Sequence, residues 1–106
     1  MNQWPVAHLA LTDNSEQTLV AAPPVTSQIT VHAVFGSNGG AALSRLAFKD
    51  GAVEKFAFAM AANGGGFAVP LPRPWTLAPG TALKVQQSVS GAADVSVSYE
   101  LSRAVP

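Results

Sequence analysis

The segment Val95-Ser96-Val97-Ser98-Tyr99-Glu100-Leu101-Ser102 alternates apolar and polar side chains along its whole length. Because successive side chains of a β-strand point to opposite faces of the sheet, this pattern predicts a strand with one buried and one solvent-exposed face. The preceding segment, Leu83-Lys84-Val85-Gln86-Gln87-Ser88-Val89, repeats the alternation, with Gln87 as the one polar residue of the inward series. We predict that the two strands form a hairpin through a turn at Ser90 to Asp94.

A further strand is predicted over residues 29–35, which show the same period of two. The inward series is Ile29, Val31, Ala33 and Phe35, and the outward series is Thr30, His32 and Val34. The strand is expected to stop at Ser37-Asn38-Gly39-Gly40, since Asn and Gly tolerate the positive φ of a tight turn.

The register of the next hairpin can be tested against its own apolar side chains. A two-residue turn at Asp50-Gly51 would place one group, Leu46 and Phe48, opposite to a second group, Phe56, Phe58 and Met60. A three-residue loop with Gly51 in the left-handed conformation gathers all five on one face, and we therefore predict that loop. The tip then becomes the best-solvated part of the chain, with five charged residues: Arg45, Lys49, Asp50, Glu54 and Lys55.

Prolines and glycines divide the remaining sequence into short pieces. Pro70, Pro72 and Pro74 exclude a short strand at residues 67–71 from the centre of a sheet, because proline has no N–H to donate, so we expect an edge or a connection there. Turns are expected at Asn63-Gly64-Gly65-Gly66 and Ala78-Pro79-Gly80. Before residue 28, weaker strands are expected near residues 7–11 and 18–22.

These segments amount to about eight short strands, and none shows helical periodicity. We predict an all-β chain folded as an antiparallel β-sandwich with jelly-roll-like connections. One domain is expected over residues 1–106, with residues 1–27 as an N-terminal docking arm or edge segment.

The composition bounds the function. The chain has 106 residues, no net charge and no cysteine, which excludes disulfides and zinc fingers and argues against nucleic-acid and anionic-membrane partners. No membrane span or export signal is expected, so synthesis is placed in the cytoplasm. Only 11% of residues are charged, against about 25% in an average soluble chain. Part of the surface is therefore expected to be covered by copies of the chain or by a larger assembly; the alternative is a neutral domain kept soluble by Ser, Thr, Asn and Gln.

Catalytic, metal and cofactor sites are not expected. His8 and His32 fall on outward strand positions without a carboxylate at metal-ligand spacing. A Ser, a His and an acid could meet in space, but no Gly-x-Ser-x-Gly turn marks a nucleophile, and the glycine runs lack the Lys-Ser/Thr pair of a phosphate loop. The stretch Pro70-Leu71-Pro72-Arg73-Pro74 is also compatible with a polyproline ligand. We predict that the protein is not an enzyme.

Two tryptophans, Trp4 and Trp75, lie beside prolines and outside the inward strand series. A tryptophan at such a position can plug the end of a core, stack on a sugar or anchor a protein interface. We take Trp4, Pro5, Arg73 and Trp75 as the candidate interface residues, on an N-terminal and a proline-rich docking surface, with the Asp50-Gly51 tip pointing away from the partner.

The stretch Pro70-Leu71-Pro72-Arg73-Pro74-Trp75-Thr76-Leu77-Ala78-Pro79-Gly80-Thr81-Ala82-Leu83, followed by Val85-Gln86 and the closing Val95-Ser96-Val97-Ser98-Tyr99-Glu100-Leu101, resembles small virion proteins of tailed bacteriophages. The resemblance covers residues 28–102 by pattern and residues 70–101 by motif. It implies a jelly-roll-like head decoration or cement protein on the outer capsid surface, with the major capsid protein as partner and a homo-oligomer, a trimer favoured, as its state. The alternatives are a tail-fibre or baseplate component and a carbohydrate-binding module on the same fold.

Overall fold

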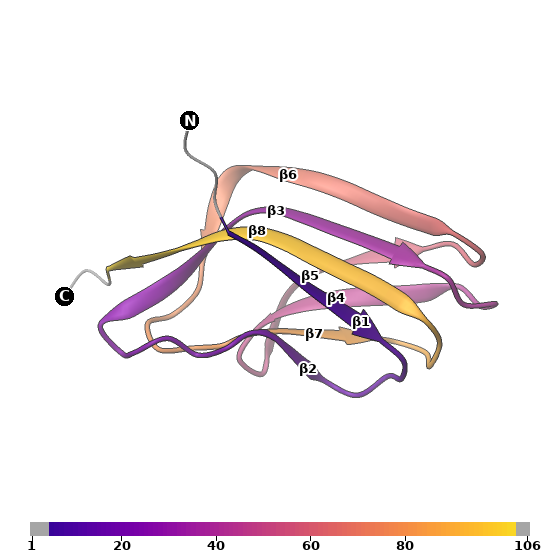
Figure 1. Cartoon of the computed structure of the whole chain (residues 1–106), viewed down its shortest axis with the longest axis horizontal. Helices are drawn as coiled ribbons and strands as arrows, with labels where there is room; N and C mark the ends of the chain where they lie inside the picture. Colours follow the sequence, from indigo (N-terminus) through magenta and orange to yellow (C-terminus); the bar gives the residue numbers. More distant parts are fainter. Residues whose placement is uncertain (1–4, 104–106) are drawn as a thin grey trace.

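A computed structural model describes residues 5–103 as eight antiparallel strands in two sheets (Figure 1). The strands are β1 (Val6–Leu11), β2 (Gln17–Val20), β3 (Ser27–Asn38), β4 (Ser44–Asp50), β5 (Val53–Met60), β6 (Gly65–Thr76), β7 (Leu83–Gln87) and β8 (Ala93–Arg103). The first sheet has the order β1-β8-β3-β6 and the second the order β2-β7-β4-β5. Every sequential connection except β4–β5 therefore crosses from one sheet to the other. This is jelly-roll connectivity, which confirms the predicted fold class.

The predicted hairpin of residues 83–101 is wrong. β7 lies in the second sheet and β8 in the first, so their connection crosses the sandwich. β8 instead pairs with β1 and with β3, and Val95 and Val97 point into the core as expected. Alternation of apolar and polar residues shows that one face of a strand is buried. It does not show whether the next strand in the chain pairs with it in the same sheet or lies across the core in the other sheet.

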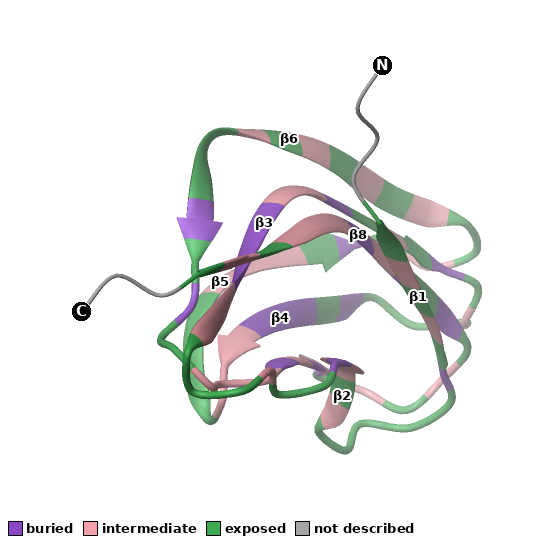
Figure 2. Ribbon diagram, turned by 60° about the vertical axis from the view of Figure 1, so that its left-hand side comes forward, coloured by how far each residue is buried: buried purple, intermediate pink, exposed green. Residues whose placement is uncertain are grey.

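The core lies between the two sheets. Buried residues lie on strands of both sheets (Figure 2). Its fully buried apolar side chains include Ile29, Val31, Val34, Leu46, Phe48, Met60, Leu77, Leu83, Val85, Val95 and Val97. An aromatic cluster closes the end between β5 and β6, where Phe48 packs edge-on against Phe58 and Phe67. The single polar residue of the inward series, Gln87, is buried as predicted.

The β4–β5 hairpin gathers its apolar side chains on one face as predicted, but by another route. Asp50 pairs with Val53, so the turn has two residues, and Gly51 has a φ of 62°. A β-bulge then restores the parity: Lys49 pairs with Glu54 while Phe48 pairs with Phe56, which leaves Lys55 as the extra residue. Lys49 is only 15% exposed, so the tip is less solvated than expected.

β3 departs from its predicted alternation because of a second bulge. Its register with both neighbours shifts between Val31 and Ala33, at His32. Beyond this point the parity reverses, so that Val34 is buried and Phe35 is 39% exposed, the opposite of the expectation. The strand ends at Asn38, within the predicted stop.

The glycine segments behave in two ways. Asn63 and Gly64 have positive φ and form the predicted turn, and Gly80 does so in the Ala78 turn, where the Thr81 N–H donates to the Ala78 carbonyl. In the run at residues 36–40, where Asn and Gly could take a positive φ, no residue does so. Gly36 is required for space, since a Cβ there would lie 2.5 Å from the Phe67 ring.

β6 forms an edge of the first sheet, as its prolines require. Pro70 pairs with Ala33 and Trp75 with Val31, so residues 71–74 have no ladder partner in β3. The first 27 residues supply β1 and β2, which are the opposite edge of the first sheet and one edge of the second.

Candidate functional site

The outer face of the second sheet carries ion pairs that join three strands and a loop. Both oxygens of the Glu54 carboxylate accept from the Arg45 guanidinium, at 2.6 and 3.1 Å. Glu16 lies between two ammonium groups, 2.8 Å from Lys49 and 3.2 Å from Lys84. Hydrogen bonds from Lys49, and to a smaller extent from Lys84, hold the pKa of Glu16 below its ordinary value. Hydrogen bonds from Arg45 likewise lower the pKa of Glu54.

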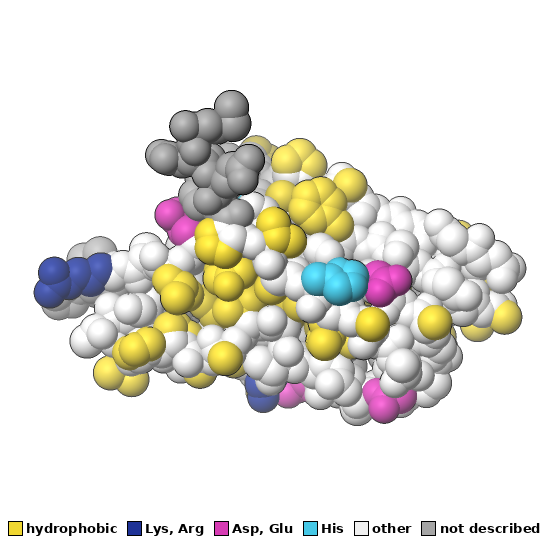
Figure 3. Space-filling model, in the orientation of Figure 1, with side chains coloured by type: hydrophobic (Ala, Val, Ile, Leu, Met, Phe, Trp, Pro, Cys, Tyr) yellow, Lys and Arg dark blue, Asp and Glu magenta, His cyan; other side chains and the backbone are white. Residues whose placement is uncertain are grey.

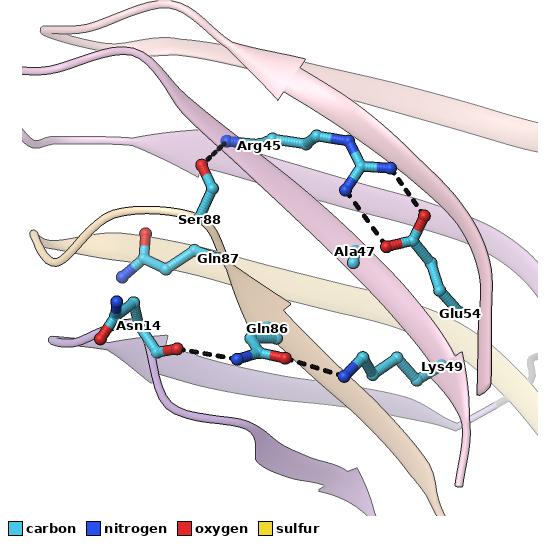
Figure 4. A pocket seen from close by; sticks show the side chains of 8 residues that line it. All are labelled: Asn14, Arg45, Ala47, Lys49, Glu54, Gln86, Gln87 and Ser88. Atoms are coloured by element: carbon cyan, nitrogen blue, oxygen red, sulfur yellow. Dashed lines mark hydrogen bonds and ion pairs between the residues drawn. The ribbon is translucent and has the colours of Figure 1, made fainter. Parts of the chain in front are cut away.

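A shallow hollow of about 200 Å³ lies in this face (Figure 4). Its lining residues are Asn14, Arg45, Ala47, Lys49, Glu54, Gln86, Gln87 and Ser88. The polar groups there bond one another: Lys49 donates to the Gln86 side-chain oxygen, and the Gln86 amide donates to the Asn14 carbonyl. With its donors and acceptors already matched, the hollow has little to offer a ligand.

The outer face of the first sheet has a different composition. Its four strands contain only two Lys or Arg residues, Arg73 in β6 and Arg103 at the end of β8. Strand pairing brings small or apolar side chains together across the face, and these are Val6, Ala33, Phe35, Ala68 and Pro70. In the view of Figure 3, apolar side chains form groups among uncharged polar surface, a His lies beside an acid near the middle, and Lys and Arg lie at the margins.

The same face holds a Ser, a His and an Asp in contact. His8 is paired with Ser96 across β1 and β8, and its Nδ1 lies 2.9 Å from the Ser96 hydroxyl. Its Nε2 lies 3.4 Å from the Asp94 carboxylate. The sequence allows such residues to meet but cannot place them, because their contact depends on pairing between strands 88 residues apart.

The surroundings of this cluster do not suit nucleophilic catalysis. His8 and Asp94 side chains are 58% and 59% exposed. The adjoining hollow of about 160 Å³ is lined by Phe35, Gly36, Ser37, Asp94 and Ser96. An oxyanion formed there would face the Asp94 carboxylate, and none of the lining side chains is a cation or an amide that could stabilise it.

The second histidine, His32, is more buried. Its Nε2 lies 3.0 Å from Glu100, and its side chain is 14% exposed. The two histidines belong to separate pairs. Within residues 5–103 no group of three or more His, Asp or Glu side chains could hold a metal ion, and no helix there is long and apolar enough to cross a membrane.

Of the candidate interface residues that the structure describes, Arg73 and Trp75 line one groove between β5 and β6, whereas Pro5 lies at the other edge of the first sheet. Trp4 lies outside the described residues. Pro5 is exposed beside β1, where its carbonyl accepts from the Tyr99 N–H, whereas Arg73 is exposed on β6 at the opposite edge of the sheet.

Trp75 is turned into the sandwich and is 9% exposed, with its ring 5.0 Å from Phe56 in an edge-to-face contact. It therefore fills the end of the core, one of the three roles considered for it. A buried ring leaves no flat platform for a sugar, which removes Trp75 as support for carbohydrate binding.

No protein-family model and no curated protein sequence matches this chain. Solved structures are similar to it in fold. A chain from the acid-stable capsid structure of Helicobacter pylori bacteriophage KHP30 matches with a TM-score of 0.59 and 12% identity, over 99% of this chain and 95% of that one. PirA matches with a TM-score of 0.55 and 8% identity, over 90% of this chain and 93% of that one. At these identities the similarity establishes a shared β-sandwich architecture.

Proposed function

We propose that this protein is a noncatalytic virion structural protein, a capsid decoration protein that docks through the outer face of the first sheet. The observation that carries the proposal is the unequal charge of the two faces. Lys and Arg pair with acids on the second sheet, whereas Val6, Ala33 and Phe35 share the first with almost no Lys or Arg. The acids of the first face, Asp94 and Glu100, lie against His8 and His32. Interface centres are depleted in charged residues, so the first face is the one suited to lie against protein.

The fold similarity supports the same proposal. The jelly roll is a common architecture of viral capsid domains, and the chain matches almost end to end with a chain from a bacteriophage capsid. The resemblance of residues 70–101 to head decoration proteins agrees with this match. The proposed partners are the major capsid protein and further copies of this chain, with a trimer favoured, at the outer capsid surface after synthesis in the host cytoplasm.

The protein would act by binding alone, as a reinforcement of the assembled shell. A protein that binds across a seam of the assembled shell buries surface that separate subunits do not offer. By mass action it then stabilises the shell relative to its parts. Candidate anchors lie at both edges of the docking face, with Pro5 beside β1 and Arg73 on β6.

Cosedimentation tests the proposal. Particles are pelleted through a density gradient from a culture that produces the protein, and its copy number per particle is measured by quantitative mass spectrometry. We expect the wild-type protein in the particle band. Phe35→Lys should lower occupancy about tenfold or more, because it places an unpaired charge in the interface.

Thr18→Lys is the matched control, since Thr18 is an exposed position on the outer face of the second sheet. It should bind as wild type does. If the protein is absent from the particle band, the virion role is wrong. If Phe35→Lys and Thr18→Lys bind equally well, the role stands but the docking face is wrong.

A further inference from the structure

A groove of about 440 Å³ opens between β5 and β6, the two strands at the same side of the sandwich. It is lined by Lys55, Phe56, Leu71, Arg73, Pro74, Trp75 and Thr76. Its apolar floor combines the half-buried Phe56 and Leu71 with the edge of Trp75. The groove adjoins the β6 edge of the proposed docking face and shares the candidate anchor Arg73 with it. A ligand could bind in the groove whether or not the protein belongs to a virion.

Both charged residues of the groove are cations. Lys55 and Arg73 are exposed, and within residues 5–103 neither forms an ion pair. Arg45, Lys49 and Lys84, by contrast, all have a carboxylate partner within 3.2 Å. Two unpaired cations beside an apolar floor complement a ligand with carboxylates flanking an apolar group.

The position of Lys55 results from the bulge in β5. Lys55 is the extra residue opposite the Phe48–Lys49 step of β4, so it has no partner in the ladder. A bulge of this kind bends the strand and redirects the side chain of the extra residue. Here the redirected side chain lines the groove together with Arg73 from β6.

The backbone at this side is also open. β5 has β4 as its only neighbour in the sheet, and no backbone–backbone hydrogen bond of residues 5–103 occupies the other edge of residues 53–59. At the end of β5, the Met60 carbonyl accepts from the Asn38 side chain. β6 cannot close onto it as a neighbouring strand, since residues 71–74 have left the ladder and Pro72 and Pro74 have no N–H. An unpaired strand edge of this kind is a template for an added strand.

We propose that the groove binds an extended acidic segment of another protein, which adds as a strand to the free edge of β5. Its backbone would pair with β5, an apolar side chain would lie over Phe56 and Trp75, and its carboxylates would meet Lys55 and Arg73. Specificity would come from the two cations, because strand pairing alone accepts many sequences.

A random octapeptide display library, panned on the purified protein in low salt, tests this inference. The expected enriched peptides carry at least two carboxylates around an apolar residue. Synthetic copies should change Trp75 fluorescence in a Trp4→Phe background, where Trp75 is the only tryptophan. Backbone amide shifts in nuclear magnetic resonance spectra should change along β5 and at residues 71–76.

Charge variants supply the decisive comparison. Lys55→Ala with Arg73→Ala should weaken binding of the enriched peptides about tenfold or more, because charge-assisted hydrogen bonds are lost. Arg103→Ala, an exposed cation that does not line the groove, should bind as wild type does. Both variants change exposed side chains, so their circular dichroism and melting should match wild type.

Three results would overturn the inference: no peptide enriched, enriched peptides without carboxylates, or amide shifts confined to other strands. A concentration-dependent dimer in light scattering that Lys55→Ala with Arg73→Ala abolishes would assign the groove to a second copy instead, and would also contradict the proposal.

Discussion

The two outer faces of the sandwich cover the same core and yet differ in almost every property that water or a partner would sense. The second sheet presents Arg45, Lys49 and Glu54 in bonded pairs. The first presents Phe35, Ala33 and Val6 beside serines and the exposed His8–Asp94 pair. Both sheets contribute apolar side chains to the core, so folding does not require this difference between the outer faces. The composition of the outer faces is therefore explained by what each face contacts rather than by the packing of the core.

The largest expected effect is on the free energy of unfolding, at the crossovers that connect the two sheets. The Gln87 amide donates to the Asp13 carbonyl at 2.9 Å and to the Gly91 carbonyl at 2.8 Å, and so joins the β1–β2 and β7–β8 crossovers. Gln87→Leu removes both bonds from a buried site and should lower the free energy of unfolding by about 2 to 4 kcal/mol. Urea unfolding followed by circular dichroism measures it.

The neighbouring residue is the matched control. Gln86 lies on the outer face and bonds Lys49 and the Asn14 carbonyl. Because water can replace these contacts, Gln86→Leu should change the free energy of unfolding by less than about 1 kcal/mol. Equal effects of the two variants would show that the crossovers are not held by Gln87.

A smaller effect is expected on the pH dependence of stability, through Glu16 on the outer face of the second sheet. The folded pKa of Glu16 lies below its ordinary 4.5, so the folded state binds fewer protons than the unfolded state at acid pH. The stabilisation by Glu16 is then fully present above about pH 4.5 and is lost as the pH falls through the lowered value. Glu16→Gln should melt below wild type at pH 7 and match it at the acid end of the titration.

Salt provides the control for this experiment. One molar sodium chloride should reduce the difference between Glu16→Gln and wild type at pH 7, since exposed charges are screened over short distances. A difference that persisted unchanged at low pH would assign the role of Glu16 to packing rather than to its charge.

The smallest effect, none at all, is expected from the Ser96–His8–Asp94 contact of the first face. Hydrolysis of p-nitrophenyl acetate should proceed at the same rate with wild type and with Ser96→Ala, because no side chain that lines the hollow beside Ser96 is a cation or an amide and the Asp94 carboxylate faces it. Saturable hydrolysis by wild type that Ser96→Ala removes would make this face catalytic and would contradict the noncatalytic role.

The sequence predicts those features of the fold that follow from the strand period of two. It fails where a β-bulge adds one residue and shifts that period. The alternation in β8 and in the other strands, without helical periodicity, predicts the sandwich. The apolar pattern also shows that the parity must change between Phe48 and Phe56, but it does not show that the extra residue is Lys55 rather than part of the turn. The bulge at His32 cannot be foreseen, because any residue type can occupy a bulge and the alternation through residues 29–35 is unbroken. The bulge at His32 exposes Phe35, and the bulge in β5 directs Lys55 into the groove.

Contacts across the sheets are beyond sequence reasoning for a different reason. His8 and Ser96 meet because β1 pairs with β8, and no local pattern specifies which strands are neighbours. Trp75 falls outside the inward series of the sequence because the prolines beside it interrupt the alternation, although its ring lies in the core.

The pairing of β1 with β8 also determines when the first sheet can form during translation. β1 has β8 as its only neighbour, and β3, at the centre of its sheet, needs β8 along its whole length from Ser27 to Asn38. While a ribosome makes the chain, β1, β3 and β6 emerge with no β8 to join them. The first sheet can therefore form only after translation has reached the final strand. Non-local pairing of this kind folds in milliseconds to seconds, which leaves apolar strands open to chaperones, or to one another, on each nascent chain.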